Sequence, residues 1–302
     1  MWPLRSMLFI PAHKLEWVRT VGRFKPDSVV IDLEDAVPPA LKVEARGMAR
    51  EGIGMLHQMG IPAFVRINEW GKSGRDDVVA VATRGFSGVM LPKAHDVQQI
   101  RELDITLAYA EGAAGLPLGS LAIMPLPETA EGLVDARQLA AASARCRGVI
   151  GVVGGVVSGD VARAAGYRPT VEGTEQLYLQ SKMVLDSRAG GAPYPMASII
   201  GTRLDDHDAV RRLVIRAKSF GYAGAVLIHP GHVQIANEIY APTPAEVEYA
   251  QGLLEAMRAA EKAGDGAVRF RGMMVDYAMM PEAEGLLREA QRRGIKPAPS
   301  PK

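Results

Sequence analysis

Cysteine is almost absent from this chain, which has a single one, Cys146, in 302 residues. This scarcity is typical of a reduced, cytoplasmic protein. Cys146 lies between Arg145 and Arg147, and neighbouring cations favour a thiolate. A lone structural cysteine is nevertheless the better interpretation.

Long apolar runs and an excess of one charge are also lacking. No stretch of about 18 apolar residues occurs, which excludes a helix that spans a bilayer, and residues 1–14 lack the layout of a signal peptide. The formal net charge is +1, without a long basic stripe, so neither nucleic acid nor a membrane is expected as the principal partner. A small-molecule ligand is expected instead.

What is present is a globular composition in which strand and helix patterns alternate. The chain is 48% hydrophobic and 23% charged, enough for one large barrel or two smaller domains. Short apolar runs closed by turn formers predict eight strands, at residues 6–11, 28–33, 63–68, 88–93, 121–126, 148–153, 196–200 and 224–230. Amphipathic segments such as 39–60 and 208–224 lie between them and end at a glycine suited to cap a helix.

This order of elements predicts an α/β fold, a (β/α)8 TIM barrel over residues 1–240, because the length is close to that fold's usual size of roughly 250 residues. A doubly wound open sheet is the alternative. Residues 241–293 are expected to form a C-terminal helical extension that carries Asp276. Residues 294–302 are expected to be a disordered tail.

Polar residues gather where the predicted strands end, which is where barrel enzymes carry their reacting groups. They are Asp32, Glu34, Asp35, Arg66, Asn68, Lys93, Glu128, Asp160 and His229. Carboxylates dominate, and carboxylates on adjacent strands need a cation to lie close together. Oxygen ligands without a cysteine or histidine pair favour Mg²⁺ over zinc. The set predicts a divalent cation site with Arg66 beside it.

Seven ordered motifs run across nearly the whole chain. They are RSMLFIPAHK (5–14), VVIDLEDAVPPALKVEAR (29–46), FVRIN (64–68), GVMLPKAH (88–95), PETAEGL (127–133), VLIHPGHVQIANEIYAPTPAEV (226–247) and GAVRFRGMMVDYAMMPEAE (266–284). Together they resemble the citrate lyase beta subunit family, which includes malyl-CoA and citramalyl-CoA lyases.

The resemblance implies roles for individual residues. Glu128 and Asp160 would hold Mg²⁺, and Arg66 and Asp276 would be catalytic. The residues implied to bind substrate or coenzyme A are Phe9, Lys14, Arg66 and Lys93, with Arg19 nearby. The acidic group of Asp32, Glu34 and Asp35 would support the water shell of the metal and position Arg66 or Lys93.

The activity implied is that of a carbon-carbon lyase, which cleaves a 3-hydroxyacyl-CoA of the citramalyl-CoA or malyl-CoA type to acetyl-CoA and a 2-keto acid. Arg66 would stabilise the charge that develops on oxygen, and Asp276 would transfer the proton at the acyl-CoA carbon. In the family this aspartate comes from a neighbouring subunit. A homo-oligomer, trimeric or hexameric, is therefore implied.

Other interpretations remain open. The chain could be a citrate lyase beta subunit that acts on a carrier-bound citryl thioester, a non-catalytic paralogue that binds an acyl-CoA, or an aldolase for free keto acids. Lys93 and His229 have equally good structural roles, as an ion-pair partner and as a hydrogen-bonded histidine. The run GVVGGVVSGD (151–160) fits neither the G-x-G-x-x-G nor the Walker pattern, so no phosphate loop is predicted there.

The sequence also departs from the family pattern around the proposed site. Ala12 and His13 follow Pro11 where Pro-Gly is expected, and Gly159 precedes Asp160 where the family usually has an acidic residue. Residues 167–174 are expected to shape the acyl pocket. Small apolar residues near the strand ends, namely Met124, Met196 and Ala197, are expected to form a pocket wall that tolerates a methyl group.

Overall fold

The computed structural model describes residues 1–298, and the chain forms two compact units. The first covers Met1–Glu238 and the second begins at Ile239. Within the described residues, no helix combines the length and the apolar character needed to cross a membrane.

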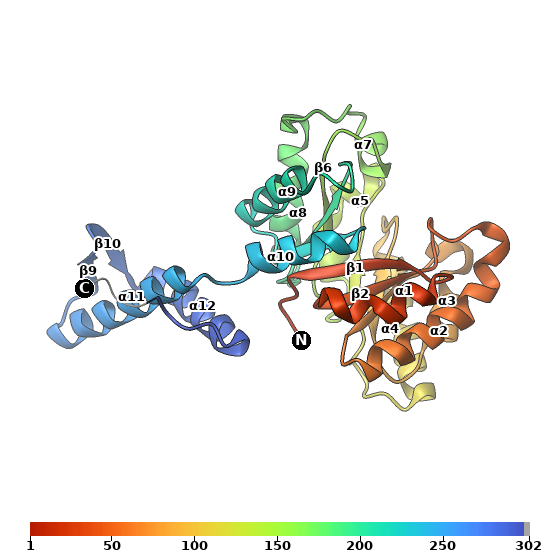
Figure 1. The fold of residues 1–302 in the computed structure, drawn as a ribbon, viewed down its shortest axis with the longest axis horizontal. Coiled ribbons are helices and arrows are strands. Elements are labelled where there is room, and N and C mark those ends of the chain that lie inside the picture. Colours follow the sequence, from red (N-terminus) through yellow and green to blue (C-terminus); the bar gives the residue numbers. More distant parts are fainter. Residues whose placement is uncertain (299–302) are drawn as a thin grey trace. The chain divides into compact units, whose positions relative to one another are not determined.

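The first unit contains eight parallel strands (Figure 1). They are β1 (Ser6–Pro11), β2 (Ser28–Asp32), β3 (Ala63–Arg66), β4 (Phe86–Leu91), β5 (Ala122–Pro125), β6 (Ile150–Gly154), β7 (Met196–Ile200) and β8 (Gly224–Leu227). All eight fall within the apolar runs predicted as strands or overlap them. The run of β2 is buried at all five positions, as expected of a strand covered on both faces.

The strands follow one another around a barrel. Their order is β5-β4-β3-β2-β1-β8-β7-β6, so the first strand pairs with the eighth. The remaining junction, between β5 and β6, is joined near their beginnings, where Ile123 of β5 bridges to Cys146 just before β6. The predicted (β/α)8 barrel is thus confirmed. The alternative of a doubly wound sheet is wrong, because the strands of such a sheet have a different order from the one found here.

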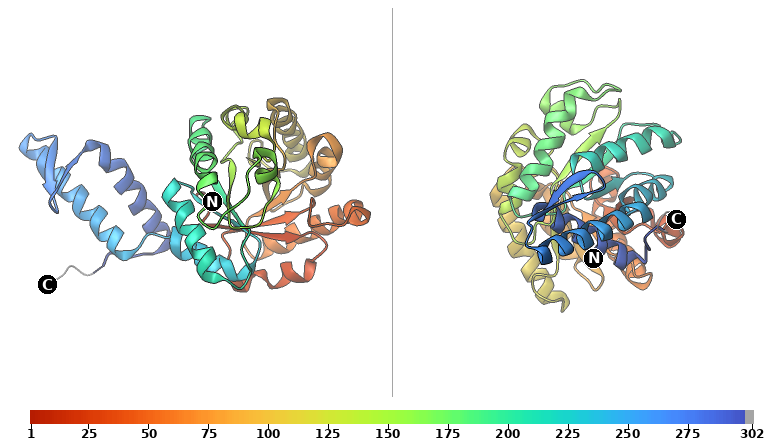
Figure 2. Two further views of the ribbon diagram at one scale, coloured as in Figure 1. Left: turned by 90° about the horizontal axis from the view of Figure 1, so that it is seen from above. Right: turned by 90° about the vertical axis from the view of Figure 1, so that its left-hand side faces the viewer.

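Helices form an outer layer around these strands (Figure 2). They are α1 (Leu15–Thr20), α2 (Lys42–Gln58), α3 (Arg75–Val81), α4 (Val97–Ala114), α5 (Ala130–Val134), α6 (Ala136–Ala141), α7 (Asp160–Ala165), α8 (Leu177–Ala189), α9 (His207–Phe220) and α10 (Val233–Tyr240). Local sequence signals set their ends. Asp96 and Gln99 form a capping box at the start of α4, and Asp206 caps α9, which stops at the left-handed Gly221.

The barrel interior is filled with apolar side chains. A single cluster there includes Met7, Phe64, Met90, Met124 and Met196, contributed by five different strands. Because every strand directs alternate side chains inward, this cluster occupies the centre of the barrel. The polar residues at the strand ends lie above a packed core.

The second unit has its own core. Helices α11 (Pro244–Ala263) and α12 (Met280–Arg293) pack side by side, and a hairpin of β9 (Ala267–Phe270) and β10 (Met273–Asp276) lies against α11 (Figure 1). Their shared apolar cluster includes Leu253, Met257 and Val275. The extension therefore contains a strand pair as well as helices. Of the predicted tail, residues 299–302 lie outside the described residues.

Candidate active site

Asp32 and Arg66 end neighbouring strands and lie opposite each other in the β2–β3 register. Nε of Arg66 donates to Oδ1 of Asp32 (2.7 Å) and Nη2 donates to Oδ2 (2.6 Å). Burial would lower the pKa of Arg66, but the hydrogen bonds and charge of Asp32, together with the charge of Glu34, outweigh burial and raise that pKa. The result is a fixed, permanently charged guanidinium.

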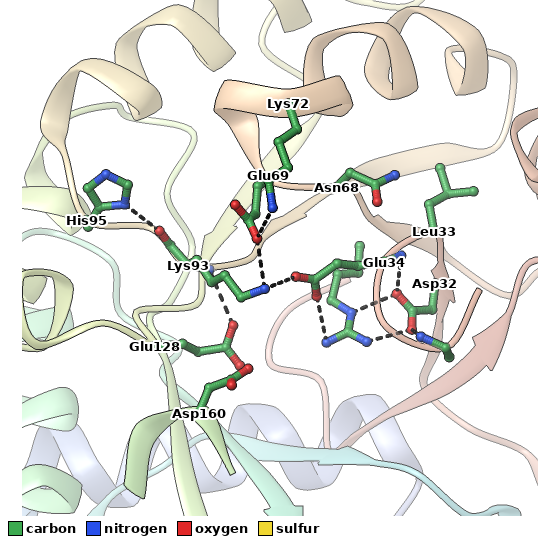
Figure 3. A network of polar contacts seen from close by, with 12 residues as sticks. Asp32, Leu33, Glu34, Asn68, Glu69, Lys72, Lys93, His95, Glu128 and Asp160 are labelled. Atoms are coloured by element: carbon green, nitrogen blue, oxygen red, sulfur yellow. Dashed lines mark hydrogen bonds and ion pairs between the residues drawn. The ribbon is translucent and has the colours of Figure 1, made fainter. Parts of the chain in front are cut away.

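Glu34 connects this pair to Lys93. It is only 4% exposed, with Oε2 lying 3.1 Å from Nη1 of Arg66 and Oε1 accepting a hydrogen bond of 3.0 Å from Nζ of Lys93. Lys93 also donates to Oε1 of Glu69 (2.9 Å). Burial raises the pKa of Glu34 even though both cations lower it. These residues form one network at the ends of β2, β3 and β4 (Figure 3).

The backbone of Lys93 is held in an unusual conformation. Its φ of 48° lies in the left-handed region, which non-glycine residues seldom occupy. Four contacts maintain it. Two are the carboxylates of Glu34 and Glu69 on Nζ. The others are the 2.7 Å hydrogen bond from Nδ1 of His95 to the carbonyl of Lys93 and the long 3.3 Å hydrogen bond from its N–H to Oε2 of Glu128. Such strain persists where the surroundings over-determine it, as at functional sites.

Further hydrogen bonds hold the residues of this network in place. Nζ of Lys42, on α2, donates to the carbonyl oxygens of Leu33 and Glu34 (3.0 and 2.7 Å) and to Oδ1 of Asn68 (2.6 Å). Asn68 in turn donates to the fully buried Asp77 through its N–H and its amide nitrogen (2.8 and 2.7 Å). These contacts fix the loops that follow β2 and β3. Of the bracing residues, the strand-end pattern had singled out only Asn68.

Glu128 follows β5 and has little to neutralise its charge. Burial and the charge of Glu34 together raise its pKa to about 7, because Arg66 and Lys93 offset only part of their effect. Asp160 is the first residue of α7 and forms an ion pair with the exposed Arg163. Both residues line one cavity, and in the view of Figure 3 their carboxyl groups are directed toward each other. Within residues 1–298, neither carboxyl group forms an ion pair with a buried cation.

This pair fits a hard divalent cation. The available donors are carboxylate oxygens, which Mg²⁺ prefers, and Mg²⁺ commonly binds through one or two carboxylates while water or substrate fills its other positions. Within residues 1–298 no group of three or more histidine, cysteine, aspartate or glutamate side chains comes together in a way that could hold a metal. The fit is therefore to a two-carboxylate site open to a ligand.

A cavity of about 340 Å³ opens beside these residues. Its lining includes the charged residues Arg66, Glu128 and Asp160. It also includes the apolar side chains of Leu126, Val152 and Ile200. Tyr167 and Pro169 also line it. The segment from residue 167 therefore contributes to the pocket.

The expected pocket wall of Met124, Met196 and Ala197 is wrong. All three residues are completely buried, and none lines the cavity. Met124 and Met196 belong to the central cluster of the barrel. Met124 and Met196 point into the barrel but lie too deep to reach the cavity. Ala197 follows Met196 directly on β7, so its side chain points to the opposite face of the strand.

A second cavity of about 320 Å³ adjoins the first, and the two share Phe9, Trp17 and Ile228. Its lining is mostly apolar and includes Phe24 and Arg23. Phe9 also stacks beneath Arg66, whose guanidinium carbon lies 4.8 Å from the ring centre. Lys14 lines neither cavity, but its Nζ lies 5.9 Å from the ring centre of Trp17. Phe9 thus lies at this junction, and Lys14 lies near Trp17, which lines both cavities.

The remaining candidate residues have other surroundings. Asp35 is exposed and takes no part in the ion pairs of the network. His229 caps the short helix at Pro230–His232 by accepting the N–H of Gly231 at Nδ1 (3.2 Å), and it lines the second cavity. Asp276 belongs to the second unit, where it accepts a hydrogen bond of 2.9 Å from the N–H of Ala278. Cys146 is buried, which raises its pKa to about 12, as expected of an inert structural thiol.

The fold and the site define a class of protein: a (β/α)8 barrel with a polar, acid-rich cavity at the carboxyl ends of its strands, the position of the active site in barrel enzymes. Comparison with known proteins identifies the family. A family model described as HpcH/HpaI aldolase/citrate lyase matches residues 5–230. The chain belongs to this family, and membership supports a CoA-related lyase activity at the level of the family.

Individual relatives match nearly the whole chain. It is 33% identical to the citrate lyase subunit beta-like protein of Deinococcus radiodurans, over 94% of this chain and 96% of the relative. It is 29% identical to a (3S)-malyl-CoA thioesterase of Cereibacter sphaeroides, over 96% and 95%. Among solved structures, it is similar to CitE of Mycobacterium tuberculosis in complex with magnesium, acetoacetate and coenzyme A, with a TM-score of 0.71 and 27% identity over 95% of this chain and 97% of that one.

Proposed function

We propose that this protein is a Mg²⁺-dependent lyase that cleaves a 3-hydroxyacyl-CoA, of the citramalyl-CoA or malyl-CoA type, to acetyl-CoA and a 2-keto acid. One observation carries the proposal: Glu128 and Asp160 lie together at the cavity beside the fixed Arg66. Burial raises the pKa of Glu128, because a buried carboxylate anion is unfavourable unless a bound cation compensates its charge.

Glu128 and Asp160 would hold the ion. When bound, Mg²⁺ would supply a Lewis acid and a template for the carboxylate and the adjacent oxygen of the keto acid. The complex of the tuberculosis CitE with magnesium, acetoacetate and coenzyme A supports this choice of metal. Asp32 and Glu34 would act indirectly, since their contacts keep Arg66 and Lys93 in place.

Cleavage requires that negative charge be stabilised as it moves. The 3-hydroxyl loses its proton to water, its oxygen forms the carbonyl of the keto acid at C3, and the bond between C2 and C3 breaks. The electron pair of that bond passes to C2 and the thioester oxygen as an enolate. A proton then returns to C2 to give acetyl-CoA. Arg66 would stabilise the charge on oxygen, because its guanidinium lines the cavity and is held by two carboxylates.

Asp276 would deliver the proton to C2 as a general acid. It is carried by the second unit, at the start of a short helix and partly accessible. We propose that it acts on the cavity of a neighbouring subunit, so that a trimer or hexamer of this chain is the active form. The support for this step is the resemblance of the MVD element to the family motif.

Coenzyme A would occupy the second cavity. This cavity adjoins the first through Phe9, Trp17 and Ile228, so a thioester in the first could continue into the second. Its aromatic and apolar lining suits the less polar parts of the coenzyme, and Arg23 and the nearby Lys14 would meet its phosphates. This arrangement favours a free coenzyme A thioester over one that is carrier-bound.

The apolar wall of the first cavity indicates the class of keto acid. Cleavage of a citryl thioester releases oxaloacetate, which has a second carboxylate. Among the described residues that line the cavity, Arg66 is the only lysine or arginine, and it already serves Asp32 and Glu34. Leu126, Val152 and Ile200 would accept the methyl group of pyruvate, which is worth about 1 to 3 kcal/mol in a hydrophobic pocket. We therefore expect citramalyl-CoA to be cleaved at least as well as malyl-CoA.

Mass-spectrometric product analysis tests this proposal. The purified protein is incubated with Mg²⁺ and, separately, with citramalyl-CoA, malyl-CoA and a carrier-bound citryl thioester. We expect acetyl-CoA with pyruvate or glyoxylate, and no products after chelation. Release of free coenzyme A with the intact hydroxy acid would indicate a thioesterase, and activity confined to the citryl carrier would indicate a citrate lyase subunit. Either outcome would refute the proposal.

A further inference from the structure

The barrel has a gap between β5 and β6 at the end where the site lies. Near the strand beginnings the two segments are joined, because the N–H of Ile123 donates to the carbonyl of Arg145 (2.9 Å) and the N–H of Arg147 donates to that of Ile123 (3.1 Å). Further along, within residues 1–298, β5 and β6 form no ladder with each other. The end of β6 therefore needs another partner on that side.

Gly154, the last residue of β6, pairs with Ile200 of β7 but has no strand partner on the side of β5. Gly155 donates to the carbonyl of Ile200 on β7 (2.8 Å). Since backbone groups alternate in direction along a parallel strand, the N–H and C=O of Gly154 point the other way, toward the gap. Unpaired buried backbone groups are costly, so this position must be satisfied by something other than β5.

The side chain of Gln176 takes that place. Its Oε1 accepts the N–H of Gly154 (3.0 Å), and its Nε2 donates to the carbonyl of Gly154 (3.2 Å). An amide side chain offers the same donor and acceptor as a backbone peptide, so Gln176 replaces one residue of the missing strand. It is 2% exposed and contributes to the cavity lining.

Further contacts hold Gln176 in this position. Gln180, on α8, donates to Oε1 of Gln176 (3.1 Å), and Nε of Arg216, on α9, donates to Oε1 of Gln180 (3.1 Å). Arg216 also donates to the carbonyl of Glu172 (2.9 Å), in the loop that leads to Gln176. The side chain is thus fixed by two helices and by its own loop.

We propose that Gln176 is a positioning residue that locks the end of β6 and thereby sets the location of Asp160. The loop from Gly155 to Gly159 follows Gly154, which Gln176 holds, and leads directly to Asp160. Its first residues are held by β7 on one side, and Gln176 holds Gly154 on the other. The consequence for metal binding rests on the proposed function, whereas the lock itself does not.

Hydrogen exchange of the Gly154 amide tests the lock without any metal. In the unaltered protein this amide should exchange much more slowly than its intrinsic rate, although no strand accepts it. In Gln176→Ala it should exchange about tenfold faster or more, because the hydrogen bond is lost. Fast exchange of the Gly154 amide in the unaltered protein would overturn the inference. This measurement is made on the unaltered protein, so it does not depend on whether a variant folds.

Binding of Mn²⁺, followed by electron paramagnetic resonance, tests the consequence. Gln176→Ala should bind Mn²⁺ about tenfold more weakly, as is typical when a residue that orients a ligand is removed. Gln138→Ala is the matched control, because Gln138 is an exposed glutamine that donates to Asp135, and its affinity should be unchanged. Equal affinity in Gln176→Ala and the parent would overturn the inference. Failure of the parent to bind Mn²⁺ would instead overturn the proposed metal site, and amide exchange would still decide on the lock.

Discussion

Replacing Glu128 with glutamine should stabilise the metal-free protein while it removes the metal site. Burial and the charge of Glu34 raise the pKa of Glu128 from 4.5 to about 7. A carboxyl whose pKa is raised on folding contributes stability that is present below pH 4.5 and is lost as the pH rises through 7. The difference between the two pKa values corresponds to about 3 kcal/mol. Glutamine is neutral at every pH and avoids this cost.

The assay is urea unfolding at pH 5 and pH 8, with EDTA or with Mg²⁺. At pH 8 with EDTA, Glu128→Gln should exceed the parent in free energy of unfolding by up to about 3 kcal/mol. At pH 5 the two should differ much less, because the parent carboxyl is then mostly protonated. Mg²⁺ should stabilise the parent at pH 8, as any ligand of the folded state does, and leave Glu128→Gln unchanged.

Glu131→Gln is the control for this experiment. Glu131 lies three residues further on and is exposed, and hydrogen bonds lower its pKa, so its replacement should not stabilise the protein. The reasoning would be refuted if Glu128→Gln were no more stable than the parent at pH 8 without metal. It would also be refuted if both proteins responded equally to Mg²⁺.

Three further outcomes are expected. Asp276→Asn should still bind Mg²⁺ and coenzyme A but lose both cleavage and the exchange of acetyl-CoA methyl protons measured by NMR. Mixing it with Glu128→Gln subunits should restore part of the activity. Exchange at the parent rate would exclude Asp276 as the base that removes these protons. Asp32→Asn should lower the free energy of unfolding by about 3 kcal/mol, since it leaves the buried Arg66 without its main partner, and should reduce turnover; an unchanged urea midpoint would contradict this. Cys146 should resist alkylation in the native protein at pH 8, because burial raises its pKa to about 12, and should react once urea unfolds the chain; rapid labelling of the native protein would be the contrary result.

The barrel could be predicted because its signals are local. Each strand is a short apolar run closed by turn formers, and β1 and β7 have the predicted bounds, residues 6–11 and 196–200. The hairpin of the second unit was not predicted as strands. Its turn is formed by Arg271 and Gly272, both with positive φ, which suits a two-residue hairpin turn. Arginine is an unusual residue there, so the turn lacked the Asn-Gly or Asp-Gly signal.

The candidate site was predictable at the strand ends and less so elsewhere. Asp32 and Arg66 were both recognised as strand-end residues, but the barrel register makes them a pair. Lys42 and Gln176 were missed because most of their partners are backbone atoms, and such contacts leave no periodic pattern in the sequence. The depth of Met124 was misjudged because alternation gives the direction of a side chain and not its height in the barrel.

The distribution of charge explains why the metal should bind where it does. Asp32, Glu34 and Glu69 each contact Arg66 or Lys93, so those cations are already shared among three acids. Within residues 1–298, Glu128 accepts a long hydrogen bond from a backbone N–H and forms no ion pair of its own, and the cation on Asp160 is Arg163, which is 74% exposed. An exposed ion pair contributes little stability, so Asp160 can readily exchange Arg163 for a cation that it binds more strongly. Bringing Mg²⁺ to Glu128 and Asp160 would therefore compensate these two acids without taking Arg66 from Asp32 and Glu34, which hold its guanidinium at the cavity.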